Sequence, residues 1–227
     1  MVGGLSSSAD GGGTVASLLA TRKLSQGHRL QPALRGHSTG FTALDEVLPA
    51  HGYPRGGITE LVGAGPRHSL ALPGFAAASH TSQVAYLSRE VLLHPQVLVA
   101  NQVALENCHF LLEASELRLF WAAQQLLASG RFPFLLIYGS NWRDHRPLLD
   151  PLAYRRLRGL AYRHDAVVLL VLDDHPALAT FARPCALRLS VEGTSNRPQP
   201  QRERQVTLCV RRHAGSSPGA VIQVEVR

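Results

Sequence analysis

The sequence predicts an α/β fold, with a mostly parallel central sheet flanked by helices and antiparallel strands added at the C-terminus. Strand-length apolar runs alternate with helix-length segments as far as Cys185, which indicates βαβ units. One run, Ala166–Leu172, is apolar at every position, as is typical of a parallel strand covered on both faces. After Cys185 the segments keep the strand period and no helix is expected, so the tail extends one edge of the sheet.

The chain has 227 residues, enough for one large domain with its own core. Residues 1–13 are rich in glycine and serine, and we expect a flexible tail there. Residues 14–38 should form a helix over Thr14–Leu24 and a polar linker, and residues 39–227 the core domain. In the core we expect strands at Ile58–Val62, Val84–Ser88, Phe134–Tyr138, Ala166–Leu172, Ala186–Val191, Gln205–Arg211 and Ala220–Val226, and helices at Leu70–His80, Leu117–Ser129 and Pro151–Arg163.

Composition excludes several classes of protein. No apolar run approaches the roughly 18–20 residues of a membrane span, so we expect no membrane partner. The start lacks a basic stretch followed by an apolar one, and we therefore expect no signal peptide. Three widely spaced cysteines without a CxxC pair argue against a disulfide framework and a zinc ribbon, and the histidines show no metal-ligand spacing. We accordingly expect a cytoplasmic chain without a bound metal.

The net charge of +7 is confined to the C-terminal part. Residues 1–130 carry eight basic and eight acidic side chains, whereas residues 131–227 carry 15 and eight. This asymmetry favours a basic face towards nucleic acid or an acidic partner. The candidate residues for binding DNA or a partner are Arg155, Arg158, Arg202, Arg204, Arg211 and Arg212. For the arginines after Asn196, nucleic acid and a protein partner are equally supported, and for the helix a solvated face is as well supported as a binding face.

The loop after Ile58–Val62 stands where a P-loop NTPase binds phosphate. Such a loop reads GxxxxGK[ST], because small residues expose backbone N–H groups, lysine neutralises the phosphates and a hydroxyl holds magnesium. Here the eight positions are Gly63, Ala64, Gly65, Pro66, Arg67, His68, Ser69 and Leu70. Only the first of the four signature positions is kept. The alternatives are a connector that has lost its nucleotide and, less favoured, a phosphate site rebuilt around Arg67.

The carboxylate that binds magnesium in P-loop NTPases is missing as well. A magnesium carboxylate should end the strand Phe134–Tyr138, yet Gly139 and Ser140 follow and no acid occurs before Asp144. The sequence therefore predicts the scaffold of an ATPase without ATPase chemistry, no catalytic residue and no cofactor.

Three segments resemble the RecA core. The run Ser38–Ala64, STGFTALDEVLPAHGYPRGGITELVGA, is similar to its entrance, and Tyr86–Pro95 is similar to the segment that ends in its catalytic glutamate, with Glu90 at that place. The tail from Arg204 is similar to the closing strands, with Arg211 and Arg212 where RecA has basic residues that reach a neighbour's nucleotide. The chain lacks the nucleotide-binding motifs and carries the PRGGITEL run. In both respects it resembles the ImuA family, the RecA-like proteins of bacterial mutagenesis cassettes. The two segments that correspond to the DNA-binding loops of RecA are short in this sequence.

This resemblance implies a RecA-like core and a non-catalytic accessory role in SOS-induced translesion synthesis, near the nucleoid. The implied partners are RecA, ImuB and an error-prone polymerase subunit, with DNA bound without sequence preference as a further expectation. The implied contacts with RecA use the segment Val15–Leu24 and an edge of the core. Two alternatives remain: a divergent ATPase similar to KaiC, which would use Arg67 and Glu90, and a cell-division inhibitor similar to SulA.

Overall fold

The computed structural model describes residues 35–90, 93–139, 151–173, 185–195, 204–213 and 219–226. The expected tail over residues 1–13 and the helix Thr14–Leu24 lie outside these residues, as does Arg202. No helix in the described part of the chain is long and apolar enough to cross a membrane.

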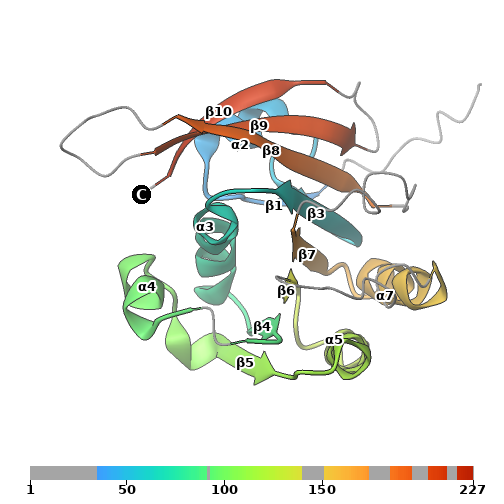
Figure 1. Ribbon diagram of the computed structural model, residues 1–227. Helices are drawn as coiled ribbons and strands as arrows, with labels where there is room; N and C mark the ends of the chain where they lie inside the picture. Colours follow the sequence, from blue (N-terminus) through green and yellow to red (C-terminus); the bar gives the residue numbers. More distant parts are fainter. Residues whose placement is uncertain are drawn as a thin grey trace, which may run out of the picture. The chain divides into compact units, whose positions relative to one another are not determined.

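An eight-stranded sheet forms the centre of the described core, in the order β10-β9-β8-β3-β7-β6-β4-β5 (Figure 1). Every pair from β8 to β5 is parallel, whereas β8 with β9 and β9 with β10 are antiparallel. The α/β prediction is therefore confirmed, including the antiparallel extension at one edge. The strands are β3 (Gly57–Gly63), β4 (Val84–Ser88), β5 (Cys108–Leu112), β6 (Phe134–Gly139), β7 (Val167–Leu172), β8 (Leu187–Ser195), β9 (Arg204–His213) and β10 (Val221–Val226).

Helices cover both faces of the parallel part, as Figure 1 shows. On one face lie α3 (Arg67–Ser79) and α4 (Pro95–Ala100), and on the other α5 (Glu116–Ala128) and α7 (Pro151–Arg163). Helix α2 (Thr42–Val47) packs against β10, in the antiparallel extension. Successive residues of β7 pack alternately against the two helix layers: Leu169 packs towards α3, and Leu170 packs towards α5 and α7. This alternation explains why β7 is apolar throughout, because neither of its faces meets water.

Helices α5 and α7 form where the sequence predicts them, and each buries one side. Helix α5 begins after Ser115, whose hydroxyl accepts a hydrogen bond from the backbone N–H of Arg118, as an N-cap residue does. It buries Leu119, Phe120, Ala123 and Leu127. In α7 the buried residues are Tyr154, Leu157 and Ala161, all on one side of the helix.

Several details differ from the predicted elements, among them the short helix α4, which was not expected. Helix α3 begins at Arg67, three positions before the expected Leu70, and it runs past Pro73 to Ser79. Strand β5 was not expected, because as the outermost strand it is only partly buried and its Cys-His-Phe-Leu-Leu run lacks a clear period. A short pair, β1 (Gly36–His37) with β2 (Tyr53–Pro54), joins the end of the expected linker to the core.

The Ser-Thr-Gly and Leu-Asp features of the sequence meet in one turn. The Asp45 carboxylate accepts hydrogen bonds from the Thr39 N–H at 2.9 Å and hydroxyl at 2.7 Å, and from the Ser38 hydroxyl at 2.7 Å. Gly40 has φ +84°, and a Cβ there would lie 2.3 Å from Cβ of Pro73. Only glycine fits this position, so the turn fixes the entrance to the core against α3.

Candidate functional site

The degenerate loop lies at the carboxyl ends of the parallel strands, the edge at which open α/β sheets bind ligands. Gly63 closes β3 with φ +121°, and a Cβ there would lie 2.8 Å from the carbonyl oxygen of Val191 on β8. The packing of β3 against β8 is therefore a sufficient reason for the first glycine of the motif, whether or not a phosphate binds. The other elements that end here are β4, β6 and β7.

The side chain of His68 fills the space above β6. Its ring stacks on the ring of Tyr138, with the centroids 3.7 Å apart and the planes inclined by 13°. Its Nε2 lies 3.5 Å from the hydroxyl of Tyr86 on β4. Tyr138 stands near the end of β6, where a P-loop enzyme would carry its magnesium carboxylate. Two aromatic rings thus occupy the place between the loop and the strand end.

Arg67 crosses from the start of α3 to the end of β7. Its Nη1 lies 2.5 Å from Oδ1 of Asp173, and its Cζ lies 6.0 Å from the centroid of the Tyr138 ring. A cation at a helix N-terminus is unfavourable by itself, and the Asp173 carboxylate offsets this charge. Nε of Arg67 is buried and has no hydrogen-bond acceptor in the described part of the chain. The guanidinium is therefore paired in charge and incompletely hydrogen-bonded.

Burial keeps the rings of this cluster neutral. Desolvation, with the nearby Arg67 charge as the smaller cause, lowers the pKa of His68 to about 4. Burial raises the pKa of Tyr138, and the Arg67 charge opposes this rise. Burial also raises the pKa of Tyr86. Near neutral pH the cluster therefore presents one guanidinium and one carboxylate, already paired, and three uncharged rings.

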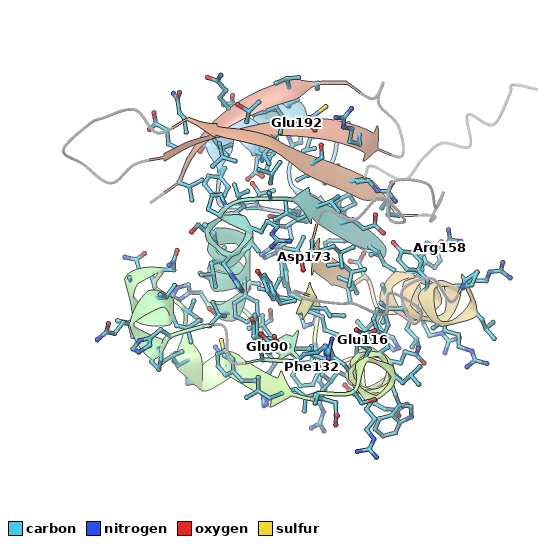
Figure 2. The ribbon with its side chains drawn as sticks, in the orientation of Figure 1. Glu90, Glu116, Phe132, Arg158, Asp173 and Glu192 are labelled. Atoms are coloured by element: carbon cyan, nitrogen blue, oxygen red, sulfur yellow. The ribbon has the colours of Figure 1, made fainter. Side chains whose placement is uncertain are left out.

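The other positions of the expected nucleotide loop offer little to a phosphate. Pro66 has no N–H, and the N–H of Arg67 donates to the carbonyl of Gly65 at 2.8 Å. Ser69 is half-buried on the first turn of α3. Glu90 is exposed just beyond β4, with its N–H donating to the Ser88 hydroxyl at 3.2 Å (Figure 2).

The predicted basic residues whose side chains the structure describes, Arg155, Arg158 and Arg211, lie on two different elements. Arg155 and Arg158 are exposed on α7. Arg211 lies on β9, where its Nη2 is 2.7 Å from Oε1 of Glu192 and its Nε donates to the Ser190 hydroxyl. The backbones of Arg204 and Arg212 belong to β9, but their side chains lie outside the described part of the structure.

A buried polar cluster on the opposite face was not predicted. Glu60, in the middle of β3, is fully buried; its Oε2 lies 2.7 Å from Nε of Arg188 on β8, and its Oε1 accepts a hydrogen bond from the Tyr154 hydroxyl at 3.1 Å. The signal was the single acidic residue inside the apolar run Ile58–Val62, since a buried carboxylate needs a partner. Its partners could not be read from the sequence, because Arg188 stands 128 residues away.

Neither a family model nor a curated protein matches this chain. Among solved structures it is similar to the RadB recombinase, with a TM-score of 0.64 and 18% identity over 82% of this chain and 94% of that one. The chain has a RecA-like fold. At this identity the likeness establishes the fold alone, and the RecA-like sheet agrees with the resemblance seen in the sequence.

Proposed function

We propose that this RecA-like chain is a non-catalytic accessory protein of the ImuA type, acting in DNA-damage-induced translesion synthesis. The observation that supports the proposal is the cluster of Arg67, His68, Tyr138 and Asp173, whose side chains contact one another at the loop where a P-loop enzyme would hold the phosphates of a nucleotide. A RecA-like fold whose nucleotide loop is occupied by its own side chains suits an accessory subunit, which binds partners without catalysing a reaction.

Nucleotide binding at this cluster would be energetically unfavourable. A triphosphate with magnesium needs free backbone N–H groups, a lysine, a hydroxyl and a carboxylate near the end of β6. To enter here, it would have to displace the His68 ring from Tyr138 and compete with Asp173 for Arg67. The neutral His68 ring offers no positive charge in return. The incompletely hydrogen-bonded Arg67 is the one feature that favours the alternative, a divergent ATPase.

The exposed apolar residues support partner binding at one edge of the core. Of the eleven large hydrophobic residues exposed in the described chain, seven lie between residues 97 and 121. Two of them, Phe110 and Leu112, lie on the edge strand β5, and the others lie on the elements before and after it in the chain: Val97, Val99, Leu105, Leu117 and Trp121. An exposed edge strand with apolar side chains is a surface that proteins normally cover. We propose that this edge contacts RecA or the ImuB-containing polymerase assembly.

Nucleotide titration tests the non-catalytic part. A fluorescent ATP analogue with magnesium should show no saturable binding to the wild-type chain, and a variant carrying His68→Gly, Ser69→Lys and Leu70→Thr is the matched attempt to restore the motif. Saturable binding by the wild type that disappears in Arg67→Ala would overturn the proposal and favour the ATPase.

Pull-down against purified RecA and ImuB, with and without DNA, tests the partner. Phe110→Ser with Leu112→Ser should weaken capture, whereas Val47→Ser with Val221→Ser, two exposed apolar residues elsewhere, should not. Equal capture by both double variants would remove the β5 edge from the proposal. Capture of the division GTPase in place of RecA would favour the inhibitor similar to SulA.

A further inference from the structure

The outer face of α7 has properties that the fold itself does not require. We define this α7 outer face as Arg155, Arg156, Gly159, Tyr162 and Arg163, all exposed and opposite the buried stripe. Helix α7 covers the same side of the sheet as α5, and Figure 2 shows Arg158 on the same helix. The buried residues alone account for the helix packing, so the outer residues are not required for it.

The charge of the helix is of one sign. Its 13 residues include four arginines and no acid. Two acids near it in the described structure are already paired: Asp165, two residues after its end, lies 3.0 Å from Arg55, and the buried Glu60, which accepts from the Tyr154 hydroxyl, is paired with Arg188. Within the described residues, no ion pair involves Arg155, Arg156 or Arg163. An uncompensated positive face of this kind attracts a polyanion.

An aromatic ring stands among these charges. Tyr162 is 80% exposed and lies beside the turn at Gly56. It follows Arg155 by seven residues, so both side chains lie on the same flank of the helix. An exposed ring next to arginines is the combination that binds single-stranded nucleic acid, because every base has a face that can stack.

Gly159 leaves a notch in the middle of this face. Nothing lies within 4 Å of the position that its Cβ would take, so no packing contact requires glycine there. Glycine in a helix interior is unfavourable, and a position that keeps it without an internal reason is suited to close approach by something outside the chain. The notch lies one turn from Arg155 and Arg156 on one side and from Tyr162 and Arg163 on the other.

We propose that the α7 outer face binds single-stranded nucleic acid, with phosphates on the arginines, a base stacked on Tyr162 and the strand running over Gly159. This deepens the proposed function by naming a direct ligand of the accessory protein. A lipid surface fits less well, because the face offers too little apolar area to enter a membrane. An acidic protein would use the arginines without needing an exposed ring and a notch together.

Fluorescence anisotropy of a labelled oligo-dT strand, measured with the full chain over a range of salt concentrations, tests the arginines. Arg156→Gln with Arg163→Gln should weaken binding about tenfold and make the slope of log K against log salt less negative by about 1.4. The matched control, Arg35→Gln with Arg118→Gln, removes the same charge at exposed sites elsewhere and should change affinity far less. Equal losses in the two double variants would overturn the proposal, as would tighter binding to vesicles of phosphatidylserine than to the oligonucleotide.

Two further substitutions separate binding from folding. Tyr162→Phe should keep the affinity, and Tyr162→Ala should lower it about tenfold through loss of stacking. Gly159→Leu should raise the thermal midpoint, because leucine is a good helix former, and yet lower oligo-dT affinity by filling the notch. Unchanged affinity in Gly159→Leu would overturn the strand path. The result of the nucleotide titration does not depend on these variants, so the two proposals can fail separately.

Discussion

The stacked His68 ring should make the protein less stable in acid, and this can be measured. In the unfolded chain His68 takes up a proton as pH falls through 6.5, whereas the folded chain keeps the ring neutral down to about pH 4. Between these values the unfolded state binds more protons, so the free energy of unfolding falls as the pH is lowered. The groups that face the ring are Arg67, Tyr86 and Tyr138.

The expected magnitude follows from the width of that window. The interval from 6.5 to about 4 corresponds to about 3.4 kcal/mol at 1.36 kcal/mol per pKa unit. The His68 side chain is only half-buried, so screening by water reduces the effect to about 2 kcal/mol.

Urea unfolding across this pH window measures the effect. His68→Phe keeps a ring stacked on Tyr138 and cannot take up a proton, so its free energy of unfolding should fall less than that of the wild type. The pKa of His37 is also lowered, mainly by burial, but His37 is present in both proteins and cancels in the difference. Identical pH dependence in the two proteins would refute the neutral, stacked state of His68.

Three other predictions concern stability, measured by chemical denaturation. Glu60→Gln should lower the free energy of unfolding by about 3–5 kcal/mol, because it leaves Arg188 buried without its countercharge. The paired change Glu60→Leu with Arg188→Met should lower it much less, and equal losses would contradict the ion-pair account. Gly63→Ala should cost about 2 kcal/mol or more from its positive φ and the nearby Val191 carbonyl, and Ala64→Gly, at an exposed position, serves as the control. Asp45→Ala should cost about 1–3 kcal/mol, because it removes the acceptor of the buried Thr39; a smaller loss would show that this turn does not hold the core entrance.

Much of the architecture could be predicted because it rests on local pattern. The apolar run of β7 and the spacing of apolar residues in α5 and α7 depend on burial at each residue, and the structure confirms these elements with shifts of at most one residue at their ends. The three lost signature positions, His68, Ser69 and Leu70, were equally visible. Strand β5 was missed because an edge strand is half exposed and carries no clean period.

The contents of the site could not be predicted in the same way. His68 meets Tyr138, and Arg67 meets Asp173, only because β3, β6 and β7 lie side by side in parallel register. Sequence pattern determined which residues are buried and which motif is absent, because both depend on neighbours along the chain. Only the tertiary structure decided which side chains meet at the loop after β3, because partners 70 or more residues apart are brought together by strand order and register.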